Sequence, residues 1–245
     1  MKSKTQAAYD CHAHIGEDED GHKLTAEQLL EQMDASNVEK AVVFPLNTPN
    51  DNKTFTKSNN IIHEAYNAHP GRFIPFFRLN PHFGWEKEFD RCLKLGFKGI
   101  KLHPRSQNFS ISSPEGIYRL AEKKNLVVLL HAGRGVENAA DEISAVVKKF
   151  PQLKLIIGHS GFVDLDNVIK KLGKCTNILF DTSACKKEHL LELVKRVSPE
   201  KIVFGSDAPY HTIGAALESV SEALAILKKT CHLKSILKDN LRGFF

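Results

Sequence analysis

Two stretches of the chain, Val127-Val128-Leu129-Leu130-His131 and Leu155-Ile156-Ile157-Gly158-His159, are apolar up to their last residue. Since both alternating faces of each stretch are apolar, each predicts a strand that is covered on both sides, as strands of parallel sheets are. A histidine adds nothing to the apolar packing of such a strand and would cost stability if it were buried without a partner. The two stretches therefore predict a parallel sheet that carries polar chemistry where its strands end.

Apolar runs of this kind recur eight times, and segments with the helical spacing of apolar residues separate them. The runs span residues 7–15, 41–46, 73–79, 99–103, 126–131, 155–159, 178–182 and 202–207. The expected helices span residues 26–35, 59–68, 86–95, 114–124, 138–150, 165–172, 188–197 and 215–229. The runs recur about every 28 residues, which is close to the minimum for a strand plus a crossover helix.

Eight strand–helix units in 245 residues predict an α/β fold, the (β/α)8 TIM barrel. A doubly wound open sheet is the alternative, and it would more often show a glycine-rich phosphate-binding turn after the first strand. Here the first run leads instead into His12-Ala13-His14-Ile15-Gly16. Because no low-complexity linker divides the chain, we expect a single metal-dependent barrel domain over residues 1–245, with residues 233–245 as a helix that closes onto the barrel.

The composition excludes several classes of protein. The chain is 42% hydrophobic and 26% charged, which is typical of globular domains and excludes intrinsic disorder and collagen-like sequence. No stretch approaches the roughly 18–20 apolar residues of a membrane span, and the N-terminus lacks the apolar core of a signal peptide. The five cysteines are irregularly spaced and form no CxxC pair. We therefore expect a cytoplasmic protein with free thiols and no membrane partner.

The net charge of +5 does not by itself predict a nucleic-acid partner. Much of the positive charge falls in pairs, at residues 123–124, 148–149, 170–171, 195–196 and 228–229. Each pair lies at or near the end of an expected helix, where the helix dipole favours a cation. Since no basic stripe interleaved with aromatic residues occurs, we expect a small-molecule substrate and no nucleic acid.

The candidate functional residues stand at the carboxyl ends of the expected strands, which form the active face of such barrels. His12 and His14 are separated by one residue, so both side chains project to the same face of the first strand and can bind one metal ion. Later strands end in His103, His131, His159 and Asp207. Five histidines and one aspartate at the same end of a barrel predict a metal site.

These motifs resemble the amidohydrolase superfamily, in particular its amidohydrolase-2 branch, which contains aminocarboxymuconate-semialdehyde-decarboxylase-like enzymes beside hydrolases. The resemblance rests on His12-Ala13-His14, on His131 after an apolar strand, on Ile157-Gly158-His159-Ser160-Gly161 and on Phe204-Gly205-Ser206-Asp207-Ala208-Pro209. It covers nearly the whole chain, because residues 96–104 resemble the fourth-strand segment of that branch and residues 236–240 resemble its C-terminal helix.

The resemblance implies one divalent metal ion, most often zinc, with manganese as an alternative. The ligands would be His12, His14, His131 and Asp207. His159 would stand beside a water in the open position of the metal, so that His159 and Asp207 are catalytic. Neutral imidazoles and a carboxylate suit Zn²⁺, which lowers the pKa of bound water toward about 7. Asp207 would accept the proton of that water, while His159 polarises the substrate.

Further residues near the strand ends are expected to contact the substrate, namely Lys101, His103, Arg78, Arg105, Arg134 and Tyr210. An arginine that reaches the pocket would suit a substrate that bears a carboxylate. In relatives with two metals, a lysine of the fourth strand is carboxylated and bridges the ions, so a two-metal site at Lys101 is the alternative to one metal. The acidic run 17–20 is expected to be a solvated loop, with part of a lid over the site as the alternative. Cys11 alternates with His12 and is expected to be a packing residue.

We expect a metal-dependent hydrolase that uses a metal-activated water on a small ester, lactone or amide. The alternative is a metal-dependent decarboxylase, a lyase, of a small unsaturated or aromatic carboxylic acid. The chain is shorter than is typical of decarboxylases of this branch, which carry a longer insertion after the first strand, and this favours hydrolysis. The oligomeric state is left open between a monomer and a homo-oligomer.

Two other classes of protein are disfavoured. A TatD-type nuclease shares the paired histidines but usually has a glutamate at the end of strand four, where Lys101 and His103 stand. A binding protein without activity would not need to keep the full set of candidate ligands.

Overall fold

The structure is a computed structural model, and it describes residues 6–48 and 50–245. Its strands form one nine-stranded sheet in the order β2-β1-β3-β4-β5-β6-β7-β8-β9. The strands are β1 (Ala8–Glu17), β2 (Lys23–Leu24), β3 (Val38–Pro45), β4 (Phe73–Arg78), β5 (Gly99–Leu102), β6 (Val127–His131), β7 (Lys154–Gly158), β8 (Ile178–Asp181) and β9 (Ile202–Val203). Strand β2 is antiparallel to β1, and every other neighbouring pair is parallel.

The two ends of the sheet meet, so the sheet closes into a barrel. The segment that follows β9 runs beside β1, with a parallel bridge between Ala13 and Ala208. Three backbone hydrogen bonds hold this seam, from Cys11 N–H to the Phe204 carbonyl (2.9 Å), from Asp207 N–H to the His12 carbonyl (2.8 Å) and from His14 N–H to the Ala208 carbonyl (2.8 Å). The prediction of a (β/α)8 barrel is confirmed, with β2 as a short addition to its eight strands.

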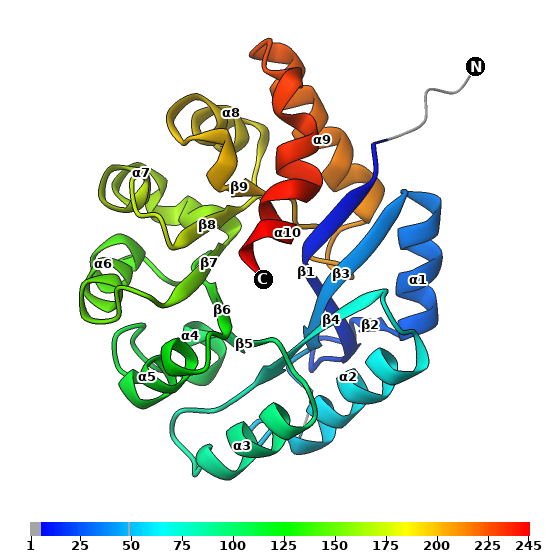
Figure 1. The fold of residues 1–245 in the computed structure, drawn as a ribbon, viewed down its shortest axis with the longest axis vertical. Helices are drawn as coiled ribbons and strands as arrows, with labels where there is room; N and C mark the ends of the chain where they lie inside the picture. The colour runs from blue at the N-terminus through cyan, green and yellow to red at the C-terminus, as the bar shows by residue number, and fades with distance from the viewer. Residues whose placement is uncertain (1–5, 49) are drawn as a thin grey trace.

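Helices surround the barrel and cover the outer faces of its strands (Figure 1). Eight of them lie around the barrel, namely α1 (Ala26–Ala35), α2 (Thr56–Ala68), α3 (Glu86–Lys94), α5 (Glu115–Lys123), α6 (Ala139–Lys149), α7 (Leu165–Leu172), α8 (Lys187–Arg196) and α9 (Ile213–Ile226). The short helix α4 (Pro104–Gln107) follows β5, and α10 (Asn240–Phe244) lies across one end of the barrel. All eight expected helices are present within a few residues of their expected ends. Helix α1 begins where the sequence specifies, because Thr25 and Gln28 form a capping box.

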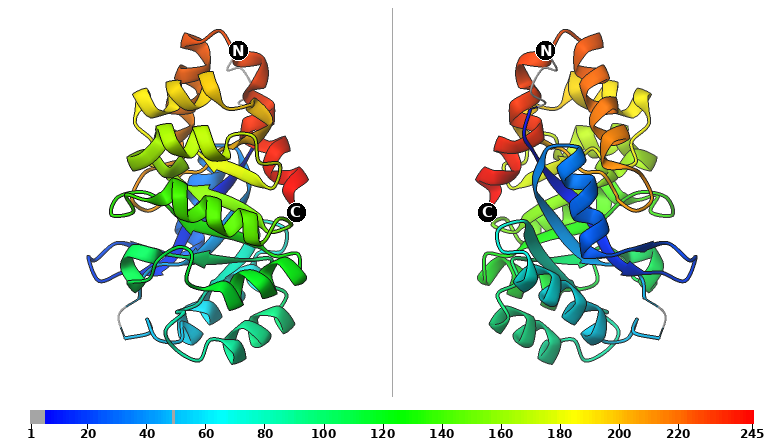
Figure 2. Two further views of the ribbon diagram at one scale, coloured as in Figure 1. Left: turned by 90° about the vertical axis from the view of Figure 1, so that its left-hand side faces the viewer. Right: turned by 90° about the vertical axis from the view of Figure 1, so that its right-hand side faces the viewer.

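Apolar side chains fill the interior of the barrel. Cys11, Phe44, Phe76 and Leu241 belong to one buried cluster inside the barrel, so Cys11 packs as expected. Residues 233–245, which we expected to close onto the barrel, include a π-helical turn at Ser235–Asp239 followed by α10. Figure 2 shows the C-terminus at one end of the barrel and the β1–β2 hairpin projecting from the other.

Within the described ranges, no helix combines the length and the apolar character needed to cross a membrane. All five cysteines are free thiols, which agrees with the expectation from their spacing.

Candidate metal centre

The paired histidines of β1 meet the aspartate that follows β9. Oδ1 of Asp207 lies 3.2 Å from Nε2 of His12 and 3.3 Å from Nε2 of His14. The segment after β9 can approach β1 and β8 this closely only with a glycine at position 205. A Cβ atom there would lie 2.1 Å from an oxygen of Asp181 and 3.0 Å from the Cβ of His12. All of these side chains are at most 11% exposed, so the group is shielded from bulk water.

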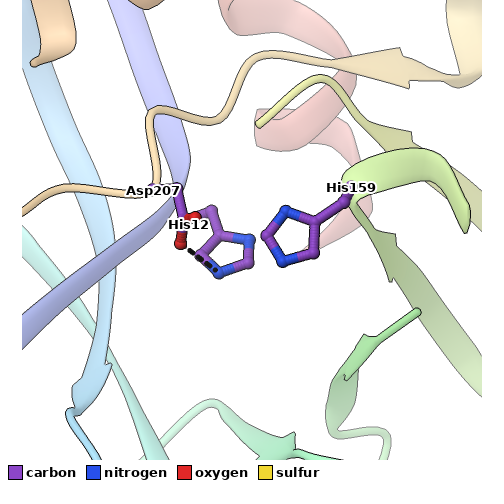
Figure 3. A group of neighbouring side chains, drawn as sticks. All are labelled: His12, His159 and Asp207. Atoms are coloured by element: carbon purple, nitrogen blue, oxygen red, sulfur yellow. Dashed lines mark ion pairs between the residues drawn. The ribbon is translucent and has the colours of Figure 1, made fainter. Parts of the chain in front are cut away.

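His159 completes a compact group with His12 and Asp207. One donor atom from each of the three residues lies within 4.8 Å of the others, and the three side chains converge from different strands (Figure 3). His131, the expected fourth ligand, lies on the far side of His159, with its Nδ1 atom 3.1 Å from Nε2 of His159. The structure therefore brings together the five residues that we call the candidate metal centre, namely His12, His14, His131, His159 and Asp207.

Lys101 and His103 extend this centre from β5. Nζ of Lys101 lies 3.1 Å from Nε2 of His12, and the ammonium group also lies over the ring of Phe44. Burial lowers the pKa of Lys101 to about 7. The ring of His103 stacks on that of His131 at a centroid distance of 3.9 Å. Lys101 and His103 therefore lie directly beside two histidines of the centre, where a bound small molecule could contact them.

The arginines differ from one another. Arg78 is buried at the end of β4, whereas Arg105 on the short helix α4 and Arg134 in the loop after β6 are exposed. The side chain of Arg105 lies against Gly135 beside a surface cavity of about 440 Å³, and only the backbone carbonyl of Arg134 contacts His131. Within the described residues, the side chains of Arg105 and Arg134 make no contact with the candidate metal centre.

Tyr210 lies over the centre and is held by the β1–β2 hairpin. Its ring packs at right angles to that of His14 at 5.6 Å, and its hydroxyl donates a hydrogen bond of 2.6 Å to Asp18. The expectation that run 17–20 is a solvated loop is wrong for Asp18, which is only 6% exposed. Because the chain turns back sharply here, the Asp18 carboxylate accepts hydrogen bonds from the backbone N–H groups of Asp20 and His22.

Asp181 is a site residue that the sequence analysis missed. Its Oδ2 atom lies 2.7 Å from Nδ1 of His12, and it accepts a hydrogen bond from the backbone N–H of His159 at 3.1 Å. Burial alone would raise the pKa of Asp181, but the charge and hydrogen bond of His12 hold it below its usual range. The available signal was the apolar run Ile178–Phe180 ending in an acid, the same pattern that identified His131.

The electrostatics of the centre favour neutral imidazoles at His14 and His159 beside a charged carboxylate at Asp207. Burial lowers the pKa of His14 to about 3 and that of His159 to about 4, so both are neutral at pH 7. Burial alone would raise the pKa of Asp207, but the charge of His12 holds it well below its usual range. For His12, burial and the charge of Lys101 lower the pKa, but the carboxylates of Asp207 and Asp181 raise it by more. The pKa of His12 therefore lies above its usual range.

Comparison with known proteins identifies the family and the fold. Residues 9–240 match the model of the amidohydrolase family Amidohydro_2. No curated protein matches the chain. Among solved structures, a TIM-barrel protein from Bordetella bronchiseptica is 14% identical with a TM-score of 0.76, and the alignment covers 97% of this chain and 98% of that one.

Two further solved structures are enzymes of different reaction classes. A 2,6-dihydroxybenzoate decarboxylase from Rhizobium is 18% identical with a TM-score of 0.74, and the alignment covers 98% of each chain. A probable 2-pyrone-4,6-dicarboxylic acid hydrolase from Acinetobacter baumannii is 15% identical with a TM-score of 0.69, over 97% of this chain and 98% of that one. At these identities the solved structures establish the fold alone. Because the family match spans nearly the whole chain, the protein belongs to the amidohydrolase-2 family of metal-dependent enzymes.

Proposed function

We propose that the protein is a metal-dependent hydrolase that acts on a small ester, lactone or amide, with residues 1–245 as one catalytic domain. The observation that carries this proposal is the convergence of two imidazole nitrogens, from His12 and His14, on one oxygen of Asp207. Imidazoles and a carboxylate that meet in this way form a donor set that suits a divalent ion such as zinc or manganese, which binds His12 in its deprotonated form.

Three of the four proposed ligands are the same in either assignment, and the fourth ligand can be one of two histidines. His12, His14 and Asp207 would hold the ion, with His131 as the fourth ligand according to the family resemblance. The short distances among His12, His159 and Asp207 support His159 in that place as the second assignment.

A divalent ion held there would supply a Lewis acid that lowers the pKa of a water molecule. Asp207, which is ionised, accepts the proton of the attacking water. Nδ1 of His159 faces the carbonyl oxygen of Ser183 at 3.3 Å, so this nitrogen carries the proton and Nε2 presents a lone pair toward the centre. His159 can take the proton of the water over from Asp207 and pass it to the leaving group, and while it holds the proton its imidazolium stabilises negative charge on the substrate oxygen.

A decarboxylase is the second candidate, and the position of Lys101 supports it. When a carbon–carbon bond breaks and carbon dioxide leaves, a proton must replace it on the remaining carbon. Lys101 is buried 3.1 Å from His12, and its lowered pKa would make it a ready proton donor there. The likeness to a decarboxylase structure is compatible with this alternative but at 18% identity adds only the fold.

The experiment that tests the proposal loads the purified full-length protein with zinc or with manganese and assays it on two panels of compounds. Esters, lactones and amides are followed by proton release, and aromatic and unsaturated acids by release of carbon dioxide. Chelation of the metal and the His12→Ala variant should abolish the activity, whereas His232→Ala, a histidine remote from the centre, should leave it unchanged. Turnover of the acids alone would favour the decarboxylase.

A further inference from the structure

Arg78 is a buried cation that lacks a carboxylate partner. Arg78 is 1% exposed. Within the described part of the chain it forms no ion pair, unlike Arg72, Arg91 and Arg196. Its hydrogen bonds go to neutral oxygens at 3.3 Å, those of the Pro45 carbonyl and the Ser106 hydroxyl. Its Nε atom has no partner among the described residues. Burial of an unpaired charge is costly, so this residue is not explained by stability.

The position of Arg78 relates it to the candidate metal centre. Arg78 on β4 pairs in register with Lys101 on β5, so the two side chains leave the sheet on the same face. Since Nζ of Lys101 reaches His12, that face is the inside of the barrel. The positive charge of Arg78 acts on Lys101, His103 and Tyr210. Burial lowers the pKa of Arg78 to about 10, so it remains charged at neutral pH.

The surrounding structure fixes the backbone of Arg78. Asn59 of α2 accepts a hydrogen bond of 2.9 Å from the Arg78 N–H and donates one of 3.1 Å to the Arg78 carbonyl. Asn59 also donates to Glu88 of α3 at 2.8 Å, and Arg91 forms an ion pair with Glu88 at 2.6 Å. The guanidinium lies 4.7 Å from the ring centroid of Phe55, which restricts its orientation. A charged group held in this way is preorganised to bind an anion.

We propose that Arg78 binds a carboxylate of the substrate, and that this carboxylate is not the group that reacts. The substrate is then a small organic acid whose ester, lactone or amide bond lies at the metal centre. The ester, lactone or amide part of this substrate class rests on the proposed function. The binding of a carboxylate by Arg78 is independent of it. A guanidinium stabilises a carboxylate as an anion and so opposes its loss as neutral carbon dioxide, which makes it suited to a carboxylate that stays on the molecule.

The burial of Arg78 is consistent with this role. Arg78, Lys101 and His12 are each 1% exposed. A carboxylate that reaches Arg78 is therefore bound away from bulk water, where a charge-assisted hydrogen bond is strong.

The test measures binding of benzoate, with benzamide as the matched uncharged probe, by calorimetry on the full-length protein. The measurements are made on metal-loaded and on chelator-treated protein, for the wild type and for Arg78→Gln, Arg78→Lys and Arg119→Gln. Arg119 is an exposed arginine of α5 and serves as the control. The metal-free series separates binding by Arg78 from direct ligation of the carboxylate to the metal, and titration of chloride and phosphate separates a carboxylate site from a general anion site.

We expect the wild type to bind benzoate and not benzamide. Arg78→Gln should weaken benzoate binding at least about tenfold in both metal states, with a smaller loss in Arg78→Lys and no change in Arg119→Gln. Equal binding by the wild type and Arg78→Gln, or binding of chloride and phosphate as tightly as benzoate, would overturn the proposal. If Arg78→Gln does not fold, a loss in Arg78→Lys supports the proposal and wild-type affinity in Arg78→Lys contradicts it. If the wild type hydrolyses esters, lactones or amides but does not bind benzoate, the assignment of Arg78 alone is wrong. If the wild type binds benzoate through Arg78 but shows no hydrolase activity, only the proposed reaction is wrong.

Discussion

Nδ1 of His12 lies 2.7 Å from Oδ2 of Asp181, a residue 169 positions later in the chain. Because Asp181 accepts the hydrogen bond from Nδ1, the Nε2 atom of His12 is the nitrogen that faces Asp207 and the rest of the centre. A carboxylate behind a ligating histidine fixes its ring orientation and raises its basicity. Asp181 therefore acts through His12 and positions it.

Replacement of Asp181 tests this relationship. Asp181→Asn keeps the size of the side chain but loses the charge, so metal affinity should fall about 10- to 100-fold while the fold is retained. Metal titration against a competing chelator measures the change, with thermal unfolding as the check on the fold. Asp90→Asn, at an exposed position of α3, is the matched control. Unchanged metal affinity in Asp181→Asn would show that Asp181 does not position His12.

The His159→Asn variant separates metal binding from catalysis. If His159 is a proton-transfer group rather than the fourth ligand, the variant should keep its metal and its fold and lose about 10²- to 10⁴-fold in turnover. Metal content and kcat are measured on the same preparation. A variant that loses its metal would instead make His159 a ligand and would replace His131 in the proposed set.

The two-metal alternative makes a separate prediction at Lys101. A carboxylated lysine that bridges two ions would lose metal in Lys101→Ala, and added bicarbonate would raise the activity of the wild type. With a single metal we expect neither effect. A content near two ions per chain, together with a carbamate on Lys101 in a crystal structure, would contradict the mononuclear centre.

The network behind Arg78 predicts a pH dependence of stability. Burial alone would raise the pKa of Glu88, but hydrogen bonds from Arg91 and Asn59 hold it below its usual range. Because the pKa of Glu88 is lower in the folded than in the unfolded protein, ionised Glu88 stabilises the fold at pH values above its unfolded pKa of about 4.3. This stabilisation is lost as the pH falls through the lower pKa of the folded state.

Glu88→Gln should therefore lower the free energy of unfolding by about 1–3 kcal/mol at pH 7, and the difference from wild type should shrink below about pH 4. Urea unfolding at several pH values measures it. Glu86→Gln, an exposed position on the same helix, is the control. A deficit of the same size at pH 3 and pH 7 would show that the charge of Glu88 does not stabilise the fold.

The barrel was predictable from sequence because its strands are covered on both faces. An apolar run such as Leu155–Ile157 admits few alternatives, and its length and spacing identify a strand of a parallel sheet. The same runs located His131 and His159, because a polar residue at the end of a buried strand has few roles besides function.

The contacts among the strand ends were not predictable in the same way. Periodicity shows that Asp181 ends a buried strand but not that its carboxylate reaches His12, since that depends on strand stagger and on the close approach that Gly205 allows. Loop conformations are also absent from the apolar pattern. Asp18 is therefore buried where a solvated loop was expected, and the side chain of Arg105 lies against Gly135.

The metal content of the purified protein tests the central claim most directly. Full-length wild type, His12→Ala and His232→Ala are loaded with zinc, freed of unbound metal and analysed by mass spectrometry for metal and protein together. The account predicts about one ion per chain in the wild type and in His232→Ala, and strong loss in His12→Ala, because the latter removes one of the proposed ligands. A wild type that retains no metal, or a His12→Ala variant that retains the full amount, would contradict it.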